Sequence, residues 1–296
     1  MLLSVIIPTY NNAGTIEKCV KSALNQDYKD EYEVLVIENA CTDNTKEILL
    51  NITDKKLRVV HNDHTVSQFQ NHNIGLREAK SDYIVFLHSD DELLPSTLSI
   101  YAQHIKMHLY PPRYIACGLS MYRDVRENMW NQFSGYNRIP NFNTIFAGEV
   151  AMRIFTSGAL FQPTGTCFSR DTVLGLGGFA GLDKTCPEDW YICAIAAYNY
   201  FEFEIIDRLM LKREYSSSWG SAFSVKEKLV RWNLIQDYFL KCLDELQMRH
   251  FDAFYREYNY PIWELYFNPL KVYWRNLKRR PWKLSRWKNL IDELKS

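Results

Sequence analysis

The first 120 residues alternate between short apolar runs and segments with helical periodicity. Five runs rich in Val, Ile and aromatic residues are nearly continuous apolar stretches, which is typical of strands buried on both faces of a parallel sheet. They are Leu3–Ile7, Glu33–Ile37, Leu57–His61, Tyr83–Leu87 and Tyr114–Leu119. The pattern predicts an α/β fold with a mostly parallel sheet sandwiched by helices. Because such sheets bind ligands at the carboxyl ends of their strands, we expect the chemistry in the loops at that edge.

Local signals predict the helices between these strands. An apolar stripe runs over residues 16–24, Thr42 or Asp43 can cap a following helix, and Ser96 after Pro95 opens another. Residues 122–164 lose periodicity and accumulate aromatic residues, Asn and Pro, which is typical of a long surface excursion.

Beyond this excursion we expect a short strand at Thr166–Ser169, a turn at Gly177-Gly178 and a helix that begins near Glu188. From Ser224 onward the pattern is helical. We therefore expect one domain over residues 1–221, made of a nucleotide-binding half (1–120) and an acceptor half (121–221). A helical C-terminal extension (222–296) would follow.

The composition is that of an ordinary globular protein, with 35 Lys plus Arg balanced by 35 Asp plus Glu. This balance gives no reason to expect nucleic acid as a partner. The charge is nevertheless uneven, because residues 269–288 hold eight basic side chains and no acid, interleaved with aromatic residues. Such a segment is typical of a surface that binds an anionic bilayer, although a solvated helix face or a contact between protomers fits it equally well.

Seven cysteines lie far apart, with no C-x-x-C pair, which argues against a disulfide framework or a zinc site and favours free thiols in a reducing cytosol. The chain starts without a basic leader, its first apolar run breaks at Pro8, and no stretch approaches the roughly 18–20 apolar residues of a spanning helix. We expect a cytoplasmic protein, with peripheral binding to the inner face of the plasma membrane as a hypothesis.

The fourth predicted strand delivers His88, Ser89, Asp90, Asp91 and Glu92 to the ligand edge. Adjacent carboxylates repel each other unless a cation neutralises them, and carboxylate oxygens suit Mg²⁺ or Mn²⁺ that carries substrate phosphates. The alternative is that these acids only cap the next helix.

Two other strand ends carry groups suited to a nucleoside. Glu38 follows the second strand and can accept hydrogen bonds from a base or a ribose, unless it is only a cap or a solvated loop residue. Pro8, Thr9 and Tyr10 close the first strand and offer small polar groups and a ring for stacking. Since neither G-x-G-x-x-G nor G-x-x-x-x-G-K-[ST] follows, dinucleotide dehydrogenases and P-loop NTPases lose their main support.

Several blocks, in this order and spacing, resemble the signature of family 2 glycosyltransferases of the GT-A fold. They are Val5-Ile6-Ile7-Pro8-Thr9-Tyr10-Asn11, Glu38-Asn39-Ala40-Cys41-Thr42-Asp43-Asn44-Thr45, Asn73-Ile74-Gly75, Tyr83-Ile84-Val85-Phe86-Leu87-His88-Ser89-Asp90-Asp91, Gly177-Gly178-Phe179 and Pro187-Glu188-Asp189-Trp190. The resemblance covers roughly residues 3–215. It implies a GT-A type, Rossmann-like fold and a metal-dependent, inverting transferase. Such an enzyme moves a sugar from a nucleotide diphosphate, UDP by family frequency, to a hydroxyl of a glycan or lipid-linked acceptor in cell-surface polysaccharide synthesis.

The resemblance also assigns roles to individual residues. The nucleotide-binding residues would be Pro8, Thr9, Tyr10, Glu38, Asn73 and Asp90. The metal ligands for Mn²⁺ or Mg²⁺ would be Asp90 and Asp91, and the resemblance leaves open which of the two binds the ion. Asp189 would be the catalytic base, while Glu188, Trp190, Arg213 and Tyr215 would contact acceptor or phosphate.

The chain departs from the family pattern at His88, where an Asp is usual, at Glu38-Asn39, where paired aspartates are common, and at Arg213-Glu214-Tyr215, where the family often has an Arg and a His. Two rival functions remain. One is a catalytically silent relative that binds a nucleotide sugar; the other is a sugar nucleotidyltransferase. The latter needs a glycine-rich, basic loop after the first strand, which this sequence lacks.

Overall fold

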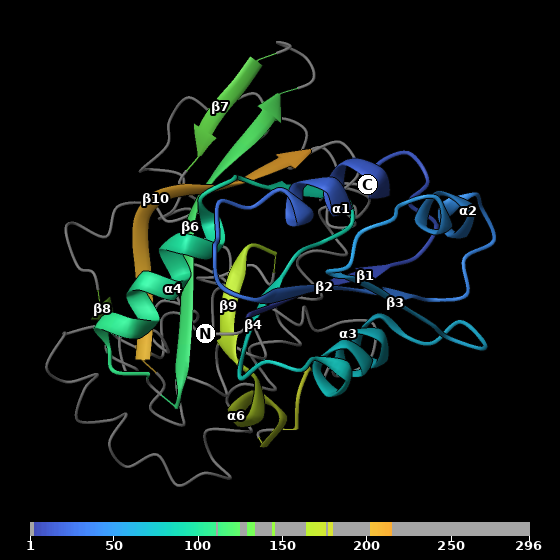
Figure 1. Ribbon diagram of the computed structural model, residues 1–296. Coiled ribbons are helices and arrows are strands. Elements are labelled where there is room, and N and C mark those ends of the chain that lie inside the picture. The colour runs from blue at the N-terminus through green and yellow to red at the C-terminus, as the bar shows by residue number, and fades with distance from the viewer. Residues whose placement is uncertain are drawn as a thin grey trace, which may run out of the picture.

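The computed structural model describes residues 3–110, 112–124, 129–133, 144–145, 164–175, 177–179 and 202–214 (Figure 1). The strands are β1 (Leu3–Thr9), β2 (Tyr32–Glu38), β3 (Leu57–His61), β4 (Tyr83–Phe86), β5 (Asp91–Leu93), β6 (Tyr114–Asp124), β7 (Met129–Phe133), β8 (Thr144–Ile145), β9 (Thr166–Ser169) and β10 (Glu202–Glu214). The helices are α1 (Ile16–Leu24), α2 (Thr45–Leu50), α3 (Gln68–Glu78), α4 (Thr97–Met107) and α6 (Arg170–Gly175).

One mixed sheet organises the described residues, with the strand order β3-β2-β1-β4-β9-β6-β10-β5. The first four strands are parallel, and β9 joins them to β6 by pairing antiparallel with both β4 and β6. Strand β10 runs parallel to β6 and antiparallel to the short β5, while β7 and β8 pair at the side with β6 and β10. The mostly parallel α/β sheet predicted from the sequence is confirmed.

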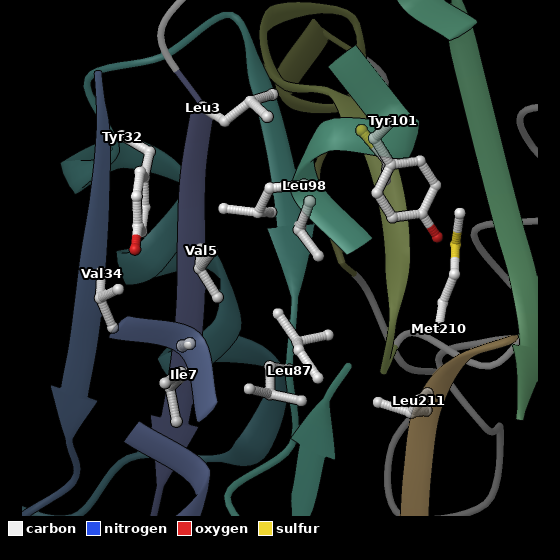
Figure 2. Close-up of a cluster of buried hydrophobic side chains, with 14 of the residues drawn as sticks. Leu3, Val5, Ile7, Tyr32, Val34, Leu87, Leu98, Tyr101, Met210 and Leu211 are labelled. Atoms are coloured by element: carbon white, nitrogen blue, oxygen red, sulfur yellow. The ribbon is translucent and has the colours of Figure 1, made fainter. Parts of the chain in front are cut away.

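The two faces of the sheet are covered by different helices. Alternate side chains of a strand point to opposite faces, so the contacts of successive β1 residues show which helices cover each face. Leu3, Val5 and Ile7 of β1 belong to one buried cluster together with residues of α1, α2 and α4. Figure 2 shows this cluster extending from Tyr32 and Val34 on β2 to Met210 and Leu211 on β10. On the opposite face α3 packs so closely that a Cβ added at Gly75 would lie 2.5 Å from Ile6 Cγ2.

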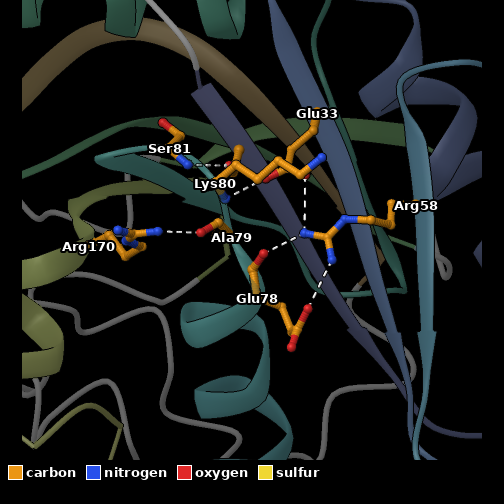
Figure 3. Close-up of polar contacts among 8 residues, drawn as sticks. Glu33, Arg58, Glu78, Ala79, Lys80, Ser81 and Arg170 are labelled. Atoms are coloured by element: carbon orange, nitrogen blue, oxygen red, sulfur yellow. Dashed lines mark hydrogen bonds and ion pairs between the residues drawn. The ribbon is translucent and has the colours of Figure 1, made fainter.

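Polar contacts close the amino ends of the first strands (Figure 3). Glu33 of β2 is buried; its Oε1 accepts hydrogen bonds from the Ser4 hydroxyl and the Lys80 N–H, both at 2.7 Å. Arg58 of β3 lies 3.3 Å from Glu33 and 3.0 Å from Glu78 at the end of α3. Arg170 of α6 donates to the Ala79 carbonyl on the same side. These contacts hold the sheet and α3 in register at the edge away from the strand ends that carry the predicted site.

The sequence signals differ in how well they located the elements. All five predicted strands are present, and Thr166–Ser169 is a strand as expected. The cap of α2 is Asn44, one residue past Asp43, whose carboxylate accepts from the Thr45 N–H. Helix α3 was not predicted, although Ser67 and Gln70 form a complete capping box at its start.

Some predictions fall on segments without a described structure. The helix expected near Glu188, the extension 222–296, most of the acceptor half and the basic segment 269–288 lie outside the described residues. Four of the seven cysteines are described, and Cys19, Cys41, Cys117 and Cys167 are free thiols. Within the described ranges, no helix is long and apolar enough to cross a bilayer.

Candidate active site

The loops that follow β1 and β2 are joined to each other at the carboxyl edge of the sheet. The Asn12 N–H donates to Thr45 Oγ1 at 2.9 Å, and the Ala13 N–H donates to the Asp43 carboxylate at 3.0 Å. Asn11, in the left-handed region with φ of 53°, accepts from the Thr42 N–H at 2.8 Å. The edge is therefore a single preorganised surface built from two sequence-distant loops.

The residues at the end of β1 present the groups expected for a nucleoside. Tyr10 is 47% exposed, which leaves its ring accessible for stacking on a base. Thr9 is buried, and its Oγ1 has no hydrogen-bond partner among the residues that the structure describes. Pro8 lies opposite Ile37 in the parallel register of β1 and β2, so it is part of the sheet at this edge.

Glu38 is bound by its own chain. One carboxylate oxygen accepts from the Cys41 N–H, and the other lies 2.9 Å from His61 Nδ1. Burial acts to raise the pKa of Glu38, but the hydrogen bonds from Cys41 and His61 outweigh burial, so this pKa lies below its ordinary value. The ionised carboxylate thus closes the loop after β2, a local structural role of the kind that the sequence analysis weighed against nucleoside binding.

Asn73 of α3 holds the glycine turn. Its Nδ2 donates to the Phe179 carbonyl at 2.6 Å, and its Oδ1 accepts from the Phe179 N–H at 2.7 Å. Gly178 has φ of 74°, and an added Cβ would lie 2.3 Å from Asn73 Oδ1. The Asn73 amide is therefore engaged by a backbone 106 residues away, which the sequence analysis did not foresee.

The segment from His88 to Asp91 turns from β4 into β5. The Asp91 N–H donates to the His88 carbonyl at 3.0 Å, and Cys19 of α1 donates its thiol to the same carbonyl at 3.3 Å. Thr164 links both ends of this turn, because its hydroxyl accepts from the His88 N–H at 3.1 Å and donates to Asp91 Oδ2 at 2.7 Å. No motif marked Thr164 in the sequence.

Asp91 is almost fully buried, with 1% of its side chain exposed, and Arg213 of β10 is its counterion at 3.2 Å. The pairing follows from the sheet, because Arg213 lies opposite Asp91 in the antiparallel β5–β10 register. Burial raises the pKa of Asp91 to about 7, and the Arg213 guanidinium limits this rise. Arg213, expected to contact acceptor or phosphate, is instead seen as the partner of a buried acid.

The side chains of His88, Asp90 and Asp91 fit a divalent cation, since one ligand atom from each lies within 4.8 Å of the others. Two carboxylates and one imidazole form a mixed oxygen and nitrogen donor set, which suits Mn²⁺ better than the oxygen-preferring Mg²⁺. Within this set Asp91 already has Arg213 and Thr164 as partners. Glu188, Asp189, Trp190 and Tyr215 lie outside the described residues, so their predicted roles stay predictions.

Comparison with known proteins decides the family. Residues 4–170, more than half of the chain, match the family model described as Glycosyl transferase family 2. The chain belongs to glycosyltransferase family 2. This confirms the resemblance drawn from the sequence blocks.

Curated relatives of this family-2 chain match it over segments of different length. The UDP-Glc:alpha-D-GlcNAc-diphosphoundecaprenol beta-1,3-glucosyltransferase WfgD of Escherichia coli is 26% identical over 80% of this chain and 86% of its own length. The GalNAc(5)-diNAcBac-PP-undecaprenol beta-1,3-glucosyltransferase of Campylobacter jejuni is 36% identical over 34% of this chain and 33% of its own. The chain spans 56% of an uncharacterised Mycobacterium tuberculosis relative, which is 29% identical over 60% of this chain.

Solved structures show the same fold. TarS 1-349 of S. aureus in complex with UDP-GlcNAc superposes with a TM-score of 0.61 at 20% identity, covering 90% of this chain and 79% of TarS 1-349. The mannosyltransferase PcManGT of Pyrobaculum calidifontis, in complex with GDP-Man and Mn²⁺, has a TM-score of 0.53 at 19% identity, covering 80% and 61%. The fold of this family-2 chain is therefore the GT-A type predicted from its sequence.

Proposed function

We propose that this protein is a metal-dependent, inverting glycosyltransferase that moves a sugar from a nucleotide diphosphate to a hydroxyl of a glycan or lipid-linked acceptor. The observation that carries the proposal is the arrangement of His88, Asp90 and Asp91 beside α1, at the same edge as the loop that begins with the exposed Tyr10. This edge joins an aromatic platform for a base to carboxylates suited to a cation and its diphosphate.

The two aspartates have different roles in this proposal. Asp91 has a permanent cation and a hydroxyl as partners, and is nearly excluded from solvent. It stabilises the turn and holds Asp90 in place. Asp90 is then the principal carboxylate for the metal and the ribose, with His88 as the neighbouring nitrogen ligand. A bound Mn²⁺ would stabilise the negative charge that develops on the leaving diphosphate.

The remaining step is the activation of the acceptor hydroxyl and its attack on the sugar. Asp189 accepts the proton of the acceptor hydroxyl, whose oxygen attacks the anomeric carbon opposite the leaving diphosphate, and a single displacement inverts that carbon. This assignment rests on the family pattern at Pro187-Glu188-Asp189-Trp190. Glu188, Trp190 and Tyr215 are proposed as acceptor or phosphate contacts on the same basis.

The names of the relatives support the choice of substrates. TarS was solved with UDP and with UDP-GlcNAc, which favours UDP as the nucleotide, whereas PcManGT was solved with GDP-Man. The Escherichia coli and Campylobacter jejuni relatives are named for undecaprenyl diphosphate-linked acceptors. A lipid-linked acceptor in polysaccharide assembly agrees with the hypothesis that residues 269–288 bind an anionic membrane. Peripheral membrane binding stays a prediction.

The test separates binding from transfer. Calorimetric titration of UDP-sugars with and without Mn²⁺ should show metal-dependent donor binding, which Asp90→Asn removes. Asp189→Asn should bind donor normally and lose about 10²–10⁴-fold in transfer, as expected for loss of a general base.

The nature of the products distinguishes the alternatives. Release of UDP supports transfer, release of pyrophosphate would indicate a nucleotidyltransferase, and donor binding without product would indicate a silent binding protein. Near-normal turnover of Asp189→Asn would refute its role as base. Asp91→Asn is the matched control: if it abolishes Mn²⁺-dependent binding while Asp90→Asn keeps it, the division between the two aspartates is wrong.

A further inference from the structure

A second group of metal-ligating side chains lies at the far end of α4. His104 and His108 are four residues apart, and the His108 N–H donates to the His104 carbonyl at 3.1 Å, so both imidazoles lie on one helix face. Glu204, near the start of β10, faces them: His104 Nδ1 lies 2.6 Å from its Oε1, and His108 Nε2 lies 3.6 Å from its Oε2. One ligand atom of each residue lies within 4.8 Å of the other two.

The carboxylate of Glu204 is held in place by a further residue. Its side chain is 5% exposed, and Tyr114 at the start of β6 donates its hydroxyl to Oε2 at 2.7 Å. The ring of Tyr114 also packs against that of His108, with centroids 6.2 Å apart. A buried carboxylate needs a cation or hydrogen bonds, and a metal-ligating carboxylate is commonly oriented by such an outer hydrogen bond.

We propose that His104, His108 and Glu204 form a binding site for a divalent transition-metal cation, with Zn²⁺ as the ion that fits best. Two imidazoles and one carboxylate are ligands that Zn²⁺ takes at about 2.0–2.2 Å, with water completing the tetrahedron. Since His104 and His108 are 22% and 30% exposed, solvent reaches their side of the site. Binding displaces the proton between His104 and Glu204 to solvent, and these two atoms move apart to about 3.3 Å, the edge of such a tetrahedron.

This site is separate from the candidate active site. Helix α4 begins just after β5, which carries Asp91, and extends away from it, so that His108 lies about 16 Å along the helix axis from Thr97. Thr97 donates its hydroxyl to the Met210 carbonyl at 2.7 Å, which ties the start of α4 to β10. A metal bound by His104, His108 and Glu204 would connect the far end of α4 to β10 as well. Its role is therefore to stabilise the packing of α4 on β10.

The experiment measures Zn²⁺ binding to the full chain after removal of metals with a chelator. An Asp90→Asn background weakens the proposed active-site cluster, and equilibrium dialysis with metal analysis should then show about one equivalent of zinc. Adding His108→Gln should weaken Zn²⁺ binding by about 100-fold or more, and Tyr114→Phe by about 10–100-fold. His64→Gln, which removes an exposed histidine outside both clusters, should leave the affinity unchanged.

Two further readouts connect binding to this site. Co²⁺ in place of Zn²⁺ should give the visible absorption of a tetrahedral nitrogen and oxygen site, and His108→Gln should abolish it. Zn²⁺ should raise the melting temperature of the Asp90→Asn protein but not that of the protein carrying both substitutions. Far-UV circular dichroism checks that each variant is folded. The proposal is overturned if the Asp90→Asn protein binds no zinc, or if adding His108→Gln leaves the zinc affinity equal to that of the His64→Gln control.

Discussion

The two ends of β10 each hold a buried acid, but by different means. Near its carboxyl end, Arg213 pairs with Asp91 of β5 at 3.2 Å. Near its amino end, Glu204 is bound by the imidazoles of His104 and His108 and by the Tyr114 hydroxyl. A guanidinium stays protonated at any physiological pH, whereas an imidazole can exchange its proton for a metal. The comparison shows that one strand pairs a buried acid with a permanent cation at the candidate site, and holds a second buried acid with imidazoles at its other end.

The largest effect should come from breaking the pair of Asp91 and Arg213. At about pH 8.5, above the pKa of about 7 for Asp91, Arg213→Met leaves an ionised carboxylate buried without its cation, and we expect a loss of about 3–5 kcal/mol in the free energy of unfolding. Urea denaturation measures it. The matched control is Asp91→Asn combined with Arg213→Met, which removes both charges and should recover most of this stability. A loss below about 1 kcal/mol in the single variant would show that Asp91 does not need Arg213, and that the Thr164 hydroxyl and solvent are enough to stabilise its carboxyl group.

A smaller effect is expected at the other end of the strand. Glu204→Gln removes the charge but keeps the shape and an oxygen that accepts from Tyr114. We expect a loss of about 1.5–3 kcal/mol, the range for a hydrogen bond to a charged group, measured in a metal-free buffer. Glu31→Gln, at an exposed acid, is the control. A loss as large as that of Arg213→Met would contradict the distinction between a permanent and an exchangeable partner.

The smallest effect concerns Glu38, a third buried acid, held by the Cys41 N–H and by His61. Because its pKa is lowered on folding, its ionised form contributes stability above the ordinary glutamate value of 4.5, and this contribution is lost as the pH falls below that value. Unfolding free energies of the natural protein and of Glu38→Gln, measured from pH 6 to pH 3, should therefore converge in acid. A difference that stays constant across this range would show that the ionisation of Glu38 does not stabilise the fold.

The buried strands β1 and β2 were easier to predict than helix α3. The runs at Leu3–Ile7 and Glu33–Ile37 are apolar because both faces of the sheet are covered, so composition alone revealed them. Helix α3 buries Asn71, His72 and Gly75 with few large apolar side chains, so its periodicity is weak, and only the capping box at Ser67 could have revealed it. Strand β10 has charged residues near both of its ends and in its middle, with apolar residues between them, so it lacks the nearly continuous apolar run that revealed the other strands.

For the candidate site, the sequence could indicate positions only for residues that follow a strand directly. Tyr10, Glu38, Asp90 and Asp91 were placed at one edge because parallel strands end together. Their partners could not be found in this way, since Thr164 lies 73 residues from Asp91 and Arg213 lies 122 residues from it. No local pattern encodes a contact over such a separation.

By itself, the sequence determined the α/β class and the edge at which Asp90 and Asp91 would be found, because burial sets strand composition and strand order sets loop position. The family followed from the resemblance of its motif blocks. Only the tertiary structure decided which charged partner each buried acid has. Sheet register places Arg213 opposite Asp91, and the packing of α4 on β10 brings His104 to Glu204. Such charge partners depend on distances of a few ångströms between segments far apart in the chain, which become defined only when the sheet is assembled.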